Sequence, residues 1–169
     1  MVIRFALPAD AADLQRIEDA ADRLLVDLLH PDGWETAAPG EVRIAAPGFV
    51  LVAAEDENGP AIGFAHVLEV EALAHLEQLA VHPDHGRRGH GRALVEAALA
   101  EARRRGHSRV TLRTYAAVPW NAPFYAGCGF RVTEPDTPFL RGLVDVEERL
   151  GLDRWGERVQ MTAPLGPAG

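Results

Sequence analysis

Apolar and polar positions follow two different periods along the chain. From residue 14 to residue 28, apolar residues recur at three- and four-residue steps, which predicts an amphipathic helix opened by residues 8–10. The same reasoning predicts helices over about 89–105 and 138–150. Residues 30–47 are broken by prolines and glycines and are predicted to be irregular, with one short helix around 40–45. Short β-rich runs predict strands at 2–7, 49–55, 60–71, 76–81, 109–115, 130–133 and 158–162.

The order of these elements predicts the fold class. Asn58 and Gly59 form a turn that joins 49–55 to 60–71 as an antiparallel hairpin. The strand, turn, helix and strand from residue 76 to residue 115 form a βαβ unit, which requires parallel pairing and a right-handed crossover. The length of 169 residues favours one domain, 1–169. We therefore expect an α/β (α+β) domain with a mixed, mostly antiparallel sheet of six or seven strands and helices on both faces.

Composition narrows the class of protein. A single cysteine excludes an internal disulfide, and neither a signal peptide nor a run of ~18 apolar residues is present, so we expect a cytoplasmic chain that does not enter a membrane. The net charge of −8 disfavours nucleic acid as a partner. All 17 basic residues are arginine, which excludes a P-loop lysine and a lysine Schiff base.

The segment 86–92, of sequence GRRGHGR, lies between an apolar strand and a helix. It therefore presents backbone N–H groups at a helix N-terminus, where anions bind. Three glycines allow close approach of the backbone, and three arginines add positive charge. This turn is predicted to cradle a phosphate or pyrophosphate.

Four short motifs occur in this context: LEQLAVHP at 76–83, RRGHGRAL at 87–94, NAPFY at 121–125 and Gly129-Phe130. Together they resemble the GNAT superfamily of acyl-CoA-dependent N-acetyltransferases, in particular a subgroup with a PWNAPFY segment. The resemblance implies a GNAT-like fold with a V-shaped cleft between the splayed parallel strands 76–81 and 109–115. It also implies acetyl-CoA as the acyl donor, with a cofactor-binding core at about 74–131.

The resemblance further implies which residues bind the donor. The backbone of Leu79, Ala80 and Val81 would pair with the pantetheine arm. Asn121 and Phe124 would add to the site, although Asn121 lies only four residues before Tyr125, with Pro123 between them, and is interpreted mainly as a helix cap. Gly86 stands where the family usually has Gln or Arg. The pyrophosphate would be held by Arg87, Arg88, Gly89, His90, Gly91 and Arg92.

Acetyl transfer to an amine needs an acid for the thiolate, a base for the amine and donors for the oxyanion. Tyr125 matches the family's acid, and its alternative interpretation is an aromatic core residue beside Phe124 and Phe130. Glu77, flanked by apolar neighbours, is the candidate base, and its alternative is a salt-bridged or solvent-facing strand residue. His75 and His66 are further candidate bases. The oxyanion would be met by the N–H of Val81 or of a neighbour.

Two other kinds of chemistry are disfavoured. His82, Asp84 and His85 lie around Pro83 without a separated third ligand, so no metal is expected. Cys128 could form a covalent intermediate, but a free cysteine is usually a small buried hydrophobe, and direct transfer needs no nucleophile.

The sequence thus predicts an N-acetyltransferase that moves an acetyl group from acetyl-CoA directly to a primary amine. The alternative is a non-catalytic acyl-CoA-binding sensor or regulatory module. The acceptor is a small-molecule amine or a protein N-terminus, its pocket shaped by residues 26–48 and those after 133. A homodimer is left open.

Overall fold

The computed structural model describes residues 1–167, which form a seven-stranded sheet flanked by helices. The strands follow the order β1-β2-β3-β4-β5-β7-β6. The element bounds are β1 Val2–Phe5, α1 Ala11–Leu29, α2 Gly40–Ala45, β2 Gly48–Ala54, β3 Ala61–Val70, β4 Leu73–Val81, α3 His90–Arg104, β5 Arg109–Tyr115, α4 Ala122–Ala126, β6 Arg131–Thr133, α5 Pro138–Leu150 and β7 Arg158–Pro164. Three short 3-10 segments complete the chain: η1 Pro8–Asp10, η2 Pro83–His85 and η3 Leu152–Trp155.

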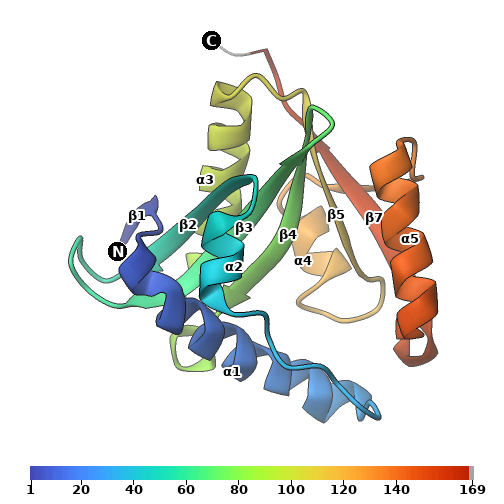
Figure 1. Cartoon of the computed structure of the whole chain (residues 1–169), viewed down its shortest axis with the longest axis horizontal. Helices are drawn as coiled ribbons and strands as arrows, with labels where there is room; N and C mark the ends of the chain where they lie inside the picture. The colour runs from blue at the N-terminus through green and yellow to red at the C-terminus, as the bar shows by residue number, and fades with distance from the viewer. Residues whose placement is uncertain (168–169) are drawn as a thin grey trace.

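The predicted fold class is confirmed. Every neighbouring pair of strands is antiparallel except β4 and β5, which are parallel. This parallel pair has only two register contacts, Ala74 with Val110 and His75 with Thr111. Beyond them the two strands part, and the gap between β4 and β5 is visible in Figure 1. The predicted splaying is therefore present.

Helices cover both faces of the sheet (Figure 1). On one face, α3 and α4 bury the larger core, which includes Leu94, Val95 and Phe130 together with residues of β2 to β5 and β7. On the other face, Leu14 and Ile17 of α1 pack with Val52 and Phe64, and Ile44 of α2 joins them. The α5 helix lies beside β5 and β7, where its Glu147 is hydrogen-bonded to arginines of both strands.

The first helix is buried only in its first half. Leu14 and Ile17 are fully buried, whereas Leu24 and Leu28, which the periodicity assigned to the same apolar face, are 44% and 48% exposed. The second half of α1 runs past the sheet towards the gap between β4 and β5 (Figure 1). The predicted helix is therefore confirmed, but its apolar face is not buried in the last turns, where no sheet lies beneath it.

A β-bulge interrupts β4 at Glu77, in the middle of the strand. Leu76 is opposite Val67 and Gln78 is opposite His66, so Glu77 is an additional residue without a partner on β3. A bulge bends its strand and increases the local twist. It lies just beyond the last contact of β4 with β5, and it therefore contributes to the parting of the two strands. Within residues 1–167, no helix combines the length and the apolarity needed to cross a bilayer.

Candidate active site

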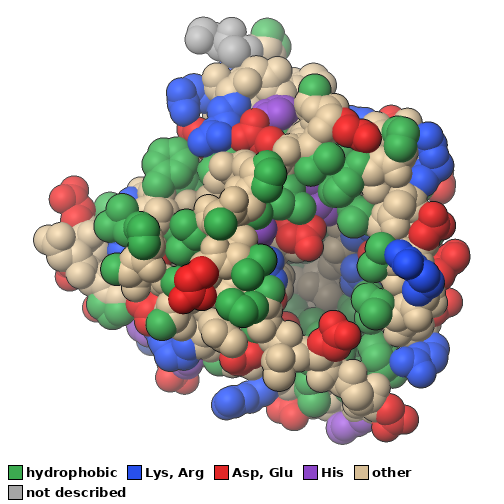
Figure 2. Space-filling model, viewed as in Figure 1, with side chains coloured by type: hydrophobic (Ala, Val, Ile, Leu, Met, Phe, Trp, Pro, Cys, Tyr) green, Lys and Arg blue, Asp and Glu red, His purple; other side chains and the backbone are tan. Residues whose placement is uncertain are grey.

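The parting of β4 and β5 opens a cleft of about 800 Å³. Figure 2 shows the hollow in the face of the molecule that carries α1 and α5. Five segments form most of its lining: β4 from Leu76 to Ala80, β5 from Leu112 to Tyr115, α1 from Glu18 to Leu25 with residues 33–39, residues 120–125 at the start of α4, and the end of α5 with η3. Segments within 26–48 and after 133 thus both contribute to the cleft, and their predicted role in shaping the acceptor's pocket stays a prediction.

The open edge of β4 presents alternate backbone groups to the cleft. The N–H of His82 donates to Ile62 O at 2.8 Å, and Ala80 lies opposite Phe64 in the same register. Because hydrogen-bonded pairs alternate along an antiparallel ladder, the N–H and C=O of Ala80 face β3. Those of Leu79 and Val81 face the other way, towards the open edge. Leu79 and Val81 can therefore pair with an extended ligand, whereas Ala80 contributes only its side chain.

The 86–92 turn has the backbone geometry of an anion site. Gly89 adopts φ 84° and precedes the first residue of α3, and Arg87 also has a positive φ, 60°. The N–H of Gly86 is bonded to Pro83 O and that of Ala93 to Gly89 O. Among the described residues, the six N–H groups between them, from Arg87 to Arg92, have no backbone acceptor. Six consecutive free donors at a helix N-terminus suit a pyrophosphate.

The side chains of the turn have separate roles. Arg87 and Arg88 are exposed, so they can add charge beside a bound anion. Arg92 instead donates from Nη1 to Gly127 O at 3.0 Å, which ties the start of α3 to the end of α4. Burial, with His85 and Arg88 nearby, lowers the pKa of His90, so this side chain is neutral at pH 7.

Tyr125 reaches the cleft from the opposite face of the sheet. It is 9% exposed and packs edge-on against Phe124 and Phe130, with ring centroids 5.2 and 5.7 Å away. It also lines the cleft, and its hydroxyl is not among the buried side-chain atoms of residues 1–167 that lack a partner, so the hydroxyl keeps solvent access. Burial raises the pKa of Tyr125, so the phenol keeps its proton. The two interpretations of this residue are compatible, because its ring belongs to the core and its hydroxyl faces the cleft.

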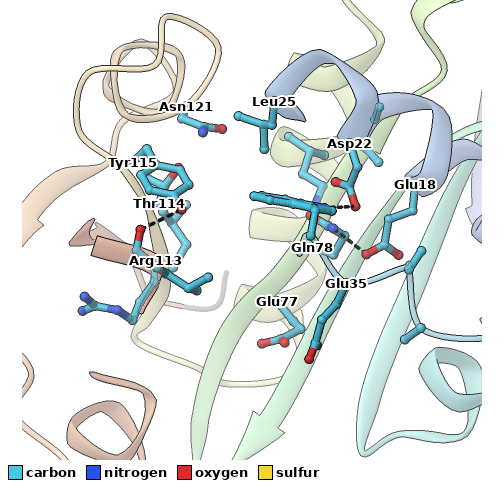
Figure 3. A pocket seen from close by; sticks show the side chains of 18 of the residues that line it. Glu18, Asp22, Leu25, Glu35, Glu77, Gln78, Arg113, Thr114, Tyr115 and Asn121 are labelled. Carbon is cyan, nitrogen blue, oxygen red and sulfur yellow. Dashed lines mark hydrogen bonds between the residues drawn. The ribbon is translucent and has the colours of Figure 1, made fainter. Parts of the chain in front are cut away.

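Glu77 enters the cleft from the bulge (Figure 3). Its side chain is 39% exposed, yet the surrounding walls remove enough water to raise its pKa, and the nearby Glu18 and Glu147 add to the effect. The nearest ring nitrogen, His75 Nε2, is 3.8 Å away. Burial lowers the pKa of His75 to about 4, so this imidazole is neutral and offers Glu77 no ion pair.

The two histidines considered as alternative bases are both structural. His75 is 3% exposed and hydrogen-bonded to Thr111 at 2.8 Å, and His66 is 3% exposed and lies 3.2 Å from Arg43. Burial also lowers the pKa of His66 to about 4. Neither histidine is among the described residues that line the cleft.

Asn121 and Phe124, at the start and in the middle of α4, have different surroundings. Asn121 occupies the N-cap position, but its side chain makes no capping hydrogen bond and lines the cleft instead (Figure 3). Its interpretation as a side-chain cap is therefore wrong: its backbone C=O accepts from Tyr125 N at 3.0 Å, and Pro123 supplies the first-turn geometry. Phe124 packs into the core, and its Cζ would lie 3.5 Å from a Cβ added at Gly91.

A hydrogen-bonded chain of side chains, which the sequence did not suggest, covers one backbone donor. The Gln78 Oε1 accepts from Leu79 N at 3.1 Å, and Gln78 Nε2 donates to Glu18 Oε1 at 2.8 Å (Figure 3). Glu18 is held in turn by Arg43 at 2.6 and 2.8 Å. The carboxamide thus occupies an N–H of the open edge of β4.

The remaining wall of the cleft was also missed by motif analysis. Asp22 of α1 accepts from Trp34 Nε1 at 3.4 Å, and the Trp34 ring lies 5.8 Å from that of Trp155 in η3. Asp22 and Glu35 both line the cleft (Figure 3). The one hint of this wall in the sequence is the i, i+4 spacing of Glu18 and Asp22, which places two carboxylates on the same side of the amphipathic helix.

Cys128 is half-buried, and burial raises the pKa of its thiol. It does not belong to the described lining of the cleft. Across residues 1–167 no three His, Cys, Asp or Glu side chains are grouped so that they could hold a metal ion.

Solved structures share this fold along almost the whole chain. The ribosomal-protein-S18-alanine N-acetyltransferase from Escherichia coli has a TM-score of 0.68 at 23% identity, with 99% of this chain and 96% of that chain covered. The PaiA N-acetyltransferase from Thermoplasma acidophilum, in complex with coenzyme A, has a TM-score of 0.68 at 16% identity over 96% and 98% of the two chains.

A putative streptothricin acetyltransferase from Bacillus anthracis, in complex with acetyl coenzyme A, has a TM-score of 0.67 at 17% identity, with 98% of each chain covered. At these identities the likeness establishes the fold. The family model of the acetyltransferase (GNAT) family matches residues 14–130, which include β4, the 86–92 turn and Tyr125. The chain therefore belongs to the acetyltransferase (GNAT) family and is an acyltransferase whose donor is acetyl-CoA.

Proposed function

We propose that this enzyme transfers the acetyl group of acetyl-CoA directly to a primary amine through a tetrahedral intermediate. The observation that carries the proposal is the convergence of Tyr125 and Glu77 on one cleft from separate elements, α4 and the β4 bulge. A phenol that keeps its proton and a carboxylate with a raised pKa are the acid and the base that aminolysis of a thioester needs.

The donor extends along the open edge of β4 in this proposal. The pantetheine arm pairs with the backbone of Leu79 and Val81, and Ala80 adds apolar contact. The pyrophosphate is held by the N–H groups of residues 87–92, with the charges of Arg87 and Arg88 beside it. The six free donors of the turn and the missing partner strand beyond His75 support this arrangement.

The reaction needs a base for the amine, a donor for the oxyanion and an acid for the thiolate. Glu77 takes the proton of the amine, directly or through water, and the nitrogen attacks the thioester carbonyl. The N–H of Leu79 meets the oxyanion, since Leu79 lines the cleft whereas Val81 is not among the described residues that line it. Tyr125 protonates the departing thiolate of CoA. The Gln78 carboxamide must turn away from Leu79 N before the thioester can use that donor.

Two measurements test the proposal together. Acetyl-CoA should raise the melting temperature, because a ligand that binds only the native state stabilises it. Free thiol should then be released from acetyl-CoA in the presence of a primary amine. A protein that is stabilised by acetyl-CoA, yet releases no thiol across a broad amine panel, would instead be a binding module. A protein that acetyl-CoA at millimolar concentration leaves unshifted would contradict the donor site itself.

A further inference from the structure

The cleft has an acceptor end that the donor residues do not use. It lies between the second half of α1 with residues 33–39 on one side and η3 on the other. Asp22, Glu35 and Glu77 all direct carboxylates into this space (Figure 3). The chemistry of these walls therefore indicates which amine the enzyme accepts, on the condition that the proposed function is correct.

Three carboxylates of the cleft have no cationic partner among the described residues. Asp22 has only the Trp34 indole N–H, Glu35 has no ion pair, and Glu77 faces the neutral His75. Burial raises the pKa of Asp22 to about 6, with Glu18 and Asp19 adding to the shift. An anion kept without a counter-ion in a partly buried site is unfavourable until a cation arrives.

Three of the four arginines that line the cleft are paired with carboxylates. Arg43 is paired with Glu18. Arg113 and Arg158 share Glu147 at 2.7 and 3.0 Å, and the Arg113 head is directed away from the cleft in Figure 3. Arg154 is exposed at the rim and lies over the Trp155 ring at 4.9 Å. Within residues 1–167 Arg154 has no carboxylate partner, so three unpaired carboxylates of the cleft stand against this one exposed arginine, and the excess charge at the acceptor end is negative.

Two indoles and a threonine hydroxyl complete the acceptor end. The rings of Trp34 and Trp155 lie 5.8 Å apart at an interplanar angle of 42°, and indole faces attract organic cations. Thr114 is 4% exposed and also lines the cleft. Its hydroxyl is not among the buried side-chain atoms of residues 1–167 that lack a partner, so it keeps solvent access and a polar ligand can reach it.

We propose that the acceptor is a di- or polyamine, whose reacting amine lies at Glu77 while a second, protonated nitrogen is bound by Asp22 beside the Trp34 indole. The second nitrogen supplies the counter-ion that Asp22 lacks, and Glu35 adds negative charge to the same space. The ammonium N–H groups can form charge-assisted hydrogen bonds to the Asp22 carboxylate. Trp34 also fixes the Asp22 carboxylate through its own N–H, so one residue serves both contacts.

Equilibrium binding to the CoA-loaded protein tests this inference without relying on turnover. By calorimetry, 1,5-diaminopentane should bind about tenfold more tightly than 1-aminopentane, since a charge-assisted hydrogen bond is worth about that factor. Asp22→Asn should abolish the preference. Asp27→Asn, an exposed position one turn further along α1 and outside the cleft lining, should preserve it.

Two results would overturn the inference: equal affinity for the two amines in the wild-type protein, or a loss of diamine affinity that is the same in Asp27→Asn as in Asp22→Asn. Tighter binding of lysine than of 1,5-diaminopentane would overturn it too, because the arginine wall would then select a carboxylate. Thiol release is scored separately. If diamine selectivity is found without thiol release, the proposed function fails and the acceptor site stands.

Discussion

In the arrangement that we propose, the donor end and the acceptor end of the cleft differ in the chemical groups that form them. The donor end consists of backbone: the open edge of β4 and the free N–H groups of residues 87–92. The acceptor end consists of side chains, with Asp22, Glu35 and the two indoles contributed by α1, a loop and η3. Backbone groups are present whatever the sequence, whereas side chains differ between sequences and can select one amine over another. The difference explains how one fold can keep a fixed donor while its acceptor varies.

Removing the Tyr125 hydroxyl should have the largest effect, because this group lies where the two ends meet. In Tyr125→Phe we expect kcat to fall by about 10²- to 10⁴-fold, the usual contribution of a general acid. Acetyl-CoA affinity and the melting temperature should change little, since the ring keeps its contacts with Phe124 and Phe130. Steady-state kinetics and a thermal melt measure both.

Tyr115→Phe is the matched control for this variant. Tyr115 also lines the cleft, but its hydroxyl donates to Leu152 O at 3.0 Å and anchors η3. Its loss should lower stability by about 1 kcal/mol and leave kcat within a few-fold. Equal losses of kcat in the two variants would show that the acid is not Tyr125.

Glu77→Gln should lower kcat by about 10²-fold, at the lower end of the range for a general base. Glu77 must be ionised to accept a proton, so the wild-type rate should fall as the pH drops through the pKa of this residue. That pKa is raised, and the fall should therefore occur at a higher pH than for an ordinary glutamate. The variant should lose this acidic limb of the kcat profile. If Glu77→Gln kept the acidic limb, the base would be another group.

Much of the donor end follows from the sequence, and little of the acceptor end does. Strand periodicity and the GRRGHGR turn already predict free backbone donors, because backbone geometry follows from local structure. The bulge at Glu77 leaves no local pattern, and neither does the pairing of Gln78 with Glu18, 60 residues away. Trp34 and Trp155 meet across 121 positions of chain, so their contact exists only in the folded protein. Leu24 and Leu28 show the reverse case, in which a correct helical period does not imply burial.

Gly89→Ala isolates the contribution of the turn backbone. Gly89 and Gly106 flank the same helix with φ of 84° and 91°, and an added Cβ meets no atom within 4 Å at either site. Alanine should strain both positions by about 1–2 kcal/mol, with similar falls in melting temperature. Only Gly89→Ala should also weaken acetyl-CoA binding. If the backbone of the turn relaxes to relieve the strain, its N–H groups no longer point at the pyrophosphate, and the affinity should fall by roughly tenfold. Equal acetyl-CoA affinities in the two variants would place the pyrophosphate elsewhere.

Gln78→Met should have the smallest effect and the opposite sign. The Gln78 carboxamide occupies Leu79 N, which the thioester oxygen needs, and Glu18 keeps its bonds to Arg43 when the carboxamide is lost. Methionine retains the unbranched stem without accepting from Leu79 N. A competing hydrogen bond of about 1 kcal/mol corresponds to roughly fivefold in affinity, so the KM for acetyl-CoA should fall by up to that factor. A higher KM together with a lower kcat would mean that Gln78 orients the strand rather than covering its donor. The donor end would then begin beyond Gln78, whose side chain would count as part of the support of β4.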